Sequence, residues 1–97
     1  MIYVERFLKD PSAVLDYGFD WEGSSPGPYL VSGETITDYT ITVATGLTLD
    51  SDSESSGFVT IWLSGGTIRT SYTVACKITT SLGRTDERSI EIFVDDR

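Results

Sequence analysis

Carboxylates are the side chains of this sequence with the clearest potential for chemistry, because the chain contains no histidine. Asp16 and Asp20 share one face of an expected strand, and paired carboxylates can act as acid and base. Residues four apart on a strand are about 13 Å apart, which is too far for two carboxyl groups to act on one bond. The spacing therefore predicts a solvated acidic strand face and not a catalytic pair.

A second acidic group has the spacing that opens a calcium-binding loop. Asp50, Asp52 and Glu54 stand at alternate positions, as in the first half of such a loop. Ser55 then replaces the required glycine, and Ile61 replaces the required bidentate glutamate. We expect no metal site here, and we expect residues 50–57 to form a polar, mobile loop.

The single cysteine, Cys76, alternates in phase with Tyr72, Val74 and Ile78, which predicts a buried core residue. One cysteine cannot form an internal disulfide. Nucleophilic catalysis needs an activating base, and a zinc site needs a cluster of cysteine and histidine. We therefore expect no catalytic residue, no metal and no cofactor.

The charge balance argues against two classes of partner. The formal net charge is −8 and the sequence pI is about 4.2. Binding to nucleic acid requires a basic footprint on the protein, and binding to an anionic membrane surface requires basic clusters. The composition therefore predicts neither ligand, and leaves open a basic protein partner as an alternative to plain solubility.

Residues 13–21 show the clearest strand pattern in the sequence, and this strand carries Asp16 and Asp20. Leu15, Tyr17, Phe19 and Trp21 alternate with Asp16, Gly18 and Asp20, which predicts one apolar face and one acidic face. Further alternating segments follow at short intervals, separated by turn signals and without helical periodicity. The sequence therefore predicts an all-β fold, a single immunoglobulin-like antiparallel β-sandwich of about seven strands.

Local signals refine this picture. Tyr72 opens a long strand after the Gly65–Gly66 turn, as the tyrosine corner of immunoglobulin-like domains does. Ile36 is out of phase with the following alternation, which predicts a bulge near Thr37. The expected core residues, which include both tryptophans as candidates for the central one, are Leu15, Tyr17, Phe19, Trp21, Trp62, Tyr72, Val74 and Ile90.

Two further segments have expected roles. Tyr29, Leu30 and Val31 are apolar residues in a loop rich in glycine and proline, and we expect them to cap one end of the core. The hairpin around Gly83 carries Arg84 and Arg88 among acidic residues, which predicts a turn with positive φ and a self-compensated charged surface.

We expect residues 1–10 to form an N-terminal arm or an edge strand, ahead of a sandwich that spans residues 11–97. The apolar side chains of this arm exceed what a completed sandwich needs, and such residues often mark a surface used by a partner. An extended segment can add a strand to the open sheet edge of a neighbour. We therefore expect the partner contacts to come from Ile2, Val4, Phe7 and Leu8, with the Pro26 and Asp50 loops peripheral.

Four segments together resemble the phage fiber–tail adaptor proteins, small immunoglobulin-like modules of tailed phages. The resemblance extends from about residue 7 to 94, although a Gly/Pro-rich insertion at 22–30 stands where family members carry a second tryptophan. The segments are Lys9-Asp-Pro-Ser-Ala-Val-Leu-Asp-Tyr-Gly-Phe-Asp-Trp21, Gly33-Glu-Thr-Ile36, Trp62-Leu-Ser-Gly-Gly-Thr67 and Ile78-Thr-Thr-Ser-Leu-Gly-Arg-Thr-Asp-Glu-Arg-Ser-Ile90.

The resemblance implies a non-enzymatic structural component of the virion, made in the bacterial host cytoplasm and present in multiple copies in a symmetric assembly. Its partners would be other phage structural proteins of the tail, neck, fiber or capsid. The alternatives are a capsid decoration protein on the head surface and a carbohydrate-binding adhesion module. The adhesion reading requires exposed aromatic side chains, for which Trp21, Tyr29 and Trp62 are the candidates.

Overall fold

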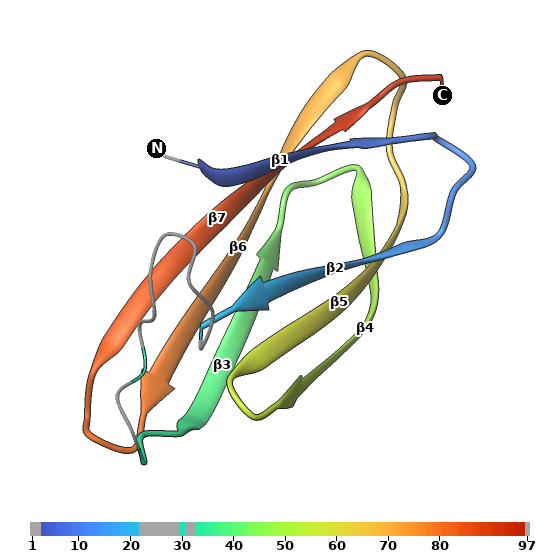
Figure 1. Cartoon of the computed structure of the whole chain (residues 1–97). Coiled ribbons are helices and arrows are strands. Elements are labelled where there is room, and N and C mark those ends of the chain that lie inside the picture. The colour runs from blue at the N-terminus through green and yellow to red at the C-terminus, as the bar shows by residue number, and fades with distance from the viewer. Residues whose placement is uncertain (1–2, 22–29, 31–32, 97) are drawn as a thin grey trace.

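The computed structural model describes residues 3–21, 30 and 33–96, and Figure 1 shows how their strands are arranged. These residues form strands and no helix. In chain order the strands are β1 (Tyr3–Lys9), β2 (Leu15–Asp20), β3 (Ile36–Val43), β4 (Leu47–Ser55), β5 (Phe58–Gly65), β6 (Thr70–Thr80) and β7 (Thr85–Val94).

The strands of the described residues form two sheets that pack face to face. One sheet has four strands in the order β1-β7-β6-β3, and the other has three strands in the order β2-β5-β4. All neighbouring strands are antiparallel except β1, which runs parallel to β7. The predicted all-β sandwich is therefore confirmed, with β1 as an outer strand of the larger sheet.

The core lies between the two sheets and follows the period-2 alternation of the strands. The apolar side of β2, with Tyr17 and Phe19, points into the core, and Trp21 and Val74 are fully buried. Of the other expected core residues, Tyr17, Phe19, Tyr72 and Ile90 are buried, and Leu15 is half-buried against them. Leu30 is also buried in this core, whereas Tyr29 and Val31 lie outside the described residues.

Trp62 is not a core residue, so the prediction for this side chain is wrong. It is 42% exposed, while its neighbours Ile61 and Leu63 are fully buried. Val59, Ile61 and Leu63 occupy the inner face of β5, and strand alternation then places Trp62 on the outer face. Trp21 alone supplies the buried tryptophan of the described core.

Two local predictions are confirmed. The pairing of β3 with β6 shifts register between Ile36 and Asp38, which is the bulge expected near Thr37. Gly83 in the β6–β7 turn has a φ of 79°, a value that glycine adopts without steric cost.

The acidic segment 50–57 is largely strand, so the expected loop is reduced to the turn at Ser56 and Gly57. Main-chain pairing with β5 holds the segment, and two of its acidic side chains have partners. Tyr39 donates a hydrogen bond from its hydroxyl to Asp52 Oδ1 at 2.7 Å, and Gly57 N–H donates to Glu54 Oε2 at 2.9 Å. The bond to Asp52 raises the pKa of Tyr39 to about 12. Charged side chains on an edge strand also discourage pairing with other chains.

Tyr72 makes the hydrogen bond expected of a tyrosine corner. The backbone N–H of Thr67 donates to the Tyr72 hydroxyl oxygen at 2.7 Å, and the tyrosine ring is buried. Hydrogen bonds from Thr67 hold the pKa of Tyr72 below its ordinary value. This bond fixes the β5–β6 turn over the end of the core.

Lys9 fastens the end of β1 to the same turn. Its side chain is fully buried, and its ammonium group donates to the carbonyl oxygens of Gly65 at 2.7 Å and Asp10 at 3.0 Å. Desolvation lowers the pKa of Lys9, with Asp10 and Asp50 acting in the opposite direction. The Lys9 backbone carbonyl accepts a further bond from Asp95 N–H at 3.0 Å. The N-terminal strand is therefore anchored at both its main chain and its side chain.

Replacing Tyr72 by Phe should lower the melting temperature by several degrees, because the N–H of Thr67 loses its acceptor while the ring remains in place. Thermal unfolding followed by circular dichroism measures the effect. Tyr39→Phe, which removes a hydroxyl bonded at the surface, is the matched control. An unchanged melting temperature for Tyr72→Phe would remove the tyrosine-corner assignment.

Replacing Lys9 by Met should lower the free energy of unfolding by ~1–3 kcal/mol, because the Gly65 carbonyl then lacks its donor while the side-chain volume is kept. Urea denaturation measures this change, and Lys77→Met on the exposed face of β6 is the control. Equal stability of Lys9→Met and wild type would show that the Lys9 ammonium group does not hold the turn.

Candidate partner-binding surfaces

The described residues offer several surfaces that a partner could contact. Among them, no group of three or more His, Cys, Asp or Glu side chains is placed to hold a metal ion. Burial raises the pKa of the Cys76 thiol to about 11, although Trp21 and Arg88 act in the opposite direction. Cys76 is therefore protonated at neutral pH. No helix in the part of the chain that is described is long and apolar enough to cross a membrane.

The N-terminal strand divides its expected anchors between two faces. Phe7 is half-buried and packs against the core, where its ring lies 5.0 Å from the Tyr17 ring, so only part of this side chain remains for the predicted partner contact. Leu8 points outward and is 45% exposed. Ile2 lies outside the described residues, and the surroundings of the Val4 side chain are not described.

On the outer face of β1, the charged side chain of Arg6 contacts two residues of β7. Arg6 Nε lies 3.3 Å from Glu91 Oε1, and the Arg6 guanidinium stands 5.2 Å from the centre of the Phe93 ring. These contacts link β1 to β7, its hydrogen-bonded neighbour. β1 is thus an edge strand of its own sandwich, with one edge paired to β7 and the other at the border of the sheet.

The outer face of the three-stranded sheet is the second surface, and we call it the aromatic face. The register places its residues in three rows that each run from β2 across β5 to β4. The rows are Asp16, Trp62 and Ser51; Gly18, Thr60 and Ser53; and Asp20, Phe58 and Ser55.

Two aromatic side chains stand on this face among small neighbours. Phe58 and Trp62 are each 42% exposed. A Cβ atom at Gly18 would lie only 2.3 Å from the Phe58 ring, so the ring lies directly over this glycine. The absence of a side chain at Gly18 lets Phe58 lie flat along the sheet.

The two arginines of the charged hairpin also make contacts outside the hairpin, which the prediction of a self-compensated surface did not include. Arg84 forms a two-pronged ion pair with Glu34, in which Nε donates to Oε2 at 2.9 Å and Nη2 donates to Oε1. Glu34 is buried, and the Arg84 side chain is 41% exposed. The guanidinium of Arg88 stacks on the Trp21 ring at 4.2 Å and donates to the backbone oxygen of Asp20 at 3.1 Å. The two arginines therefore link the hairpin to Glu34 and to Asp20 and Trp21.

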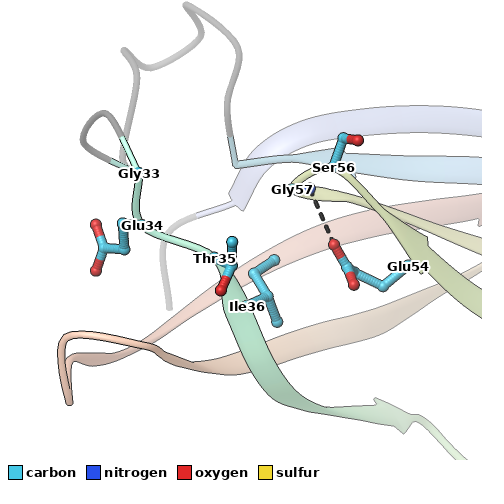
Figure 2. Close-up of a pocket in the computed structure, with 7 residues that line it drawn as sticks. All are labelled: Gly33, Glu34, Thr35, Ile36, Glu54, Ser56 and Gly57. Atoms are coloured by element: carbon cyan, nitrogen blue, oxygen red, sulfur yellow. Dashed lines mark hydrogen bonds between the residues drawn. The ribbon is translucent and has the colours of Figure 1, made fainter.

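A pocket of about 460 Å³ lies between the start of β3 and the β4–β5 turn (Figure 2). Glu34 and Glu54 both line it, but Figure 2 shows the Glu34 side chain pointing away from Glu54. Both carboxylates also accept hydrogen bonds within the chain, from Arg84 and from Gly57. Its two carboxylates therefore do not converge on a common point, as the polar groups of a small-molecule site do.

The two packed sheets and the Tyr72 corner define an immunoglobulin-like β-sandwich. Solved structures with the same fold include a PKD domain from the KIAA 1837 protein, with a TM-score of 0.53 and 16% identity over 92% of this chain and 80% of that chain. The endo-fucoidan hydrolase MfFcnA9 of glycoside hydrolase family 107 gives a TM-score of 0.57 and 18% identity. That match covers 98% of this chain but only 16% of the hydrolase chain. At these identities the likeness shows the fold alone.

The family follows from the sequence itself. Residues 9–93 match the family described as podophage GP4 fiber-tail adaptor protein gp77, and the chain belongs to this family. The expected resemblance to phage fiber–tail adaptors is thereby confirmed. A search of the curated proteins finds no match.

Sequence reasoning missed the aromatic face although a signal for it was present. Val59, Ile61 and Leu63 already fill one face of β5, so Phe58 and Trp62 share the other by alternation alone. The Glu34–Arg84 pair had no comparable signal, because its partners are 50 residues apart.

The Glu34–Arg84 pair should show strong coupling in a double-mutant cycle. Arg84→Met leaves the buried Glu34 carboxylate without its main partner and should cost roughly 2–3 kcal/mol, less than for a wholly buried pair because Arg84 is partly exposed. The double variant Glu34→Met/Arg84→Met should lose much less than the sum of the single changes. Urea denaturation measures all three, and additive losses would contradict the assignment.

Proposed function

We propose that the protein is a non-enzymatic structural component of a tailed-phage particle, an adaptor module that joins tail or neck proteins to fibers. The observation that carries this proposal is the family match over residues 9–93, which covers nearly the whole sandwich. The proposed location is the virion, with several copies in a symmetric assembly. Its partners are other phage structural proteins, and neither nucleic acid nor membrane is among them.

The chemistry of the described residues supports the non-enzymatic part of the proposal. The chain has no histidine, and its single thiol is buried and protonated. The acidic side chains at 52 and 54 are bonded within the fold. Rigid packing between two sheets suits a module that transmits force and position between partners.

One docking site within this function is the free edge of β1. A strand at the border of a sheet can accept a partner strand through main-chain hydrogen bonds, with alternate side chains fixing the register. We keep Ile2, Val4, Phe7 and Leu8 as the anchors, with a smaller part for Phe7 because its half-buried ring packs on Tyr17. Leu8 is the anchor whose exposure supports this site directly.

Locating the chain in a reconstruction of the intact particle tests the adaptor function. We expect its density between the tail or neck and the fibers. Density on the head exterior would instead identify a capsid decoration protein, and absence from purified particles would contradict a structural role altogether.

Replacing Leu8 by Asp tests the docking edge, because it places a charge among the proposed contacts without touching the core. In particles assembled by a phage that lacks the wild-type gene, we expect Leu8→Asp to lower the number of copies per particle roughly tenfold, the loss of about 1.4 kcal/mol of binding. The control Leu82→Asp changes an exposed leucine in the β6–β7 turn and should assemble normally. Equal incorporation of both variants would move the docking site away from β1.

A further inference from the structure

The border of the larger sheet at β3 leaves the core partly uncovered. Val74, Cys76 and Ile78 form the inward row of β6 and are fully buried. The residues directly opposite them on β3 are only half-buried, although they pack against the same core. These partners are Val43, Ile41 and Tyr39. Apolar surface therefore remains in contact with solvent along this border, and a further strand beside β3 would cover it.

The main chain of β3 has hydrogen-bonding groups that face away from β6. The N–H of Ala44 donates to the carbonyl oxygen of Thr73 at 3.1 Å, so these two residues form a hydrogen-bonded pair. Hydrogen-bonded and non-hydrogen-bonded pairs alternate along an antiparallel ladder. The N–H and C=O groups of Tyr39, Ile41 and Val43 therefore point toward the border, where no described strand pairs with β3.

This part of β3 lacks the features that usually keep an edge strand from pairing with another chain. Such features include lysine or proline on the strand, charges that point inward and a bulge. β4, a border strand of the smaller sheet, has three acidic residues and a register shift after Leu49. The bulge of β3 lies at its start, and residues 38–43 pair with β6 in regular register with Asp38 as their one charged residue. The other five are Thr, Tyr, Ile and Val, which favour strands.

Two carboxylates of β4 lie next to this border. Asp52 and Glu54 are opposite Ile61 and Val59, which are buried, so the carboxylates are on the inner side of the smaller sheet. The hydrogen bond from the Tyr39 hydroxyl to Asp52 spans the gap between the two sheets. The pocket in Figure 2 is lined by residues of both strands, so the surface is hollowed at the start of the same border.

These carboxylates restrict the chemistry of a segment that covers the border. Each accepts one described hydrogen bond, Asp52 from Tyr39 and Glu54 from Gly57, and a carboxylate has room for several. Neither makes an ion pair with any described residue, and β3 and β4 contain no Lys or Arg. An apolar segment would desolvate the two charges without compensation, whereas Lys or Arg would pair with them.

We infer that the β3 border docks an extended, basic segment of a different virion protein. The segment pairs with residues 38–43 through its main chain and directs Lys or Arg toward Asp52 and Glu54. This inference rests on the proposed adaptor function and specifies the chemistry of a second partner. β1 and β3 are the opposite borders of one sheet, so a partner at each border does not exclude the other.

A second copy of the chain fits this border less well. The chain has a net charge of −8, and the two strands at this border carry acidic residues without a basic one. Juxtaposed like charges oppose an interface formed by two copies through this border. Charge complementarity therefore selects a basic partner.

The test supplies full-length variants to a phage that lacks the wild-type gene, and quantitative mass spectrometry counts copies per purified particle. Ile41→Pro removes an outward N–H at an edge position that tolerates proline, and Ile41→Val keeps the N–H as its control. Asp52→Lys reverses one charge at the border, and Glu87→Lys makes the same change at an exposed position of β7. Ile41→Pro and Asp52→Lys should each lower incorporation at least roughly tenfold, and both controls should assemble as wild type does.

A photo-reactive amino acid in place of the exposed Thr42 identifies the occupant directly. Irradiation of assembled particles should give a cross-link to a segment of a different virion chain that contains Lys or Arg. Thermal unfolding verifies the fold of every variant. If Ile41→Pro fails to fold, Asp52→Lys and the cross-link decide the inference.

The outcomes separate the inference from the function on which it rests. Absence of the wild-type protein from particles would contradict the adaptor function itself. If wild type is incorporated and folded Ile41→Pro and Asp52→Lys assemble as well as their controls, the inference is overturned while the function stands. Loss with only one of them would remove either the strand pairing or the basic partner, and would also overturn it. A cross-link to a second copy, or to a segment without Lys or Arg, would do the same.

Discussion

Burial of the aromatic row of β2 against the larger sheet is the interaction on which the rest of the structure depends. Trp21, at the end of this row, is fully buried, and its backbone is bonded to Gly57 and Leu30. Arg88 of β7 stacks on its ring. One residue thereby connects β2, the β4–β5 turn and the opposite sheet, and large aromatic side chains dominate the energy of a core of this size. Because inward and outward residues alternate, the same packing fixes what the outer face of the smaller sheet presents.

Polar contacts between residues far apart in the sequence then hold the ends of the sandwich together. Lys9 reaches Gly65 over 56 residues, and Arg84 reaches Glu34 over 50. Together with the stacking of Arg88 on Trp21, these pairs join the segments that carry the resemblance to the family. Lys9 is joined to the Gly–Gly turn, the Gly33–Ile36 segment to the Gly83–Arg88 hairpin, and that hairpin to Trp21. The residues that looked like a family signature are, in this structure, the residues that hold separate segments together.

Sequence reasoning found the strands because period-2 alternation is a local property, and it found the bulge at Thr37 and the corner at Tyr72 for the same reason. It failed where tertiary contacts override composition. The polar run from Asp50 to Ser55 lacks apolar residues, yet pairing with β5 satisfies its backbone and makes it a strand. Trp62 was assigned to the core on residue type, although the alternation of β5 places it outside. The partners of Arg84 and Glu34 depend on how distant segments meet, which no local pattern encodes.

An adaptor must hold two partners at once, so it needs two surfaces that do not compete. The border of the larger sheet at β1 and the outer face of the smaller sheet meet this condition, because they belong to different layers of the sandwich (Figure 1). They also differ in chemistry. The β1 edge presents main-chain groups at the border of its sheet, whereas the outer face of the smaller sheet presents the exposed rings of Phe58 and Trp62. If both surfaces are used, each can be changed separately, because distant positions without shared partners contribute nearly additively.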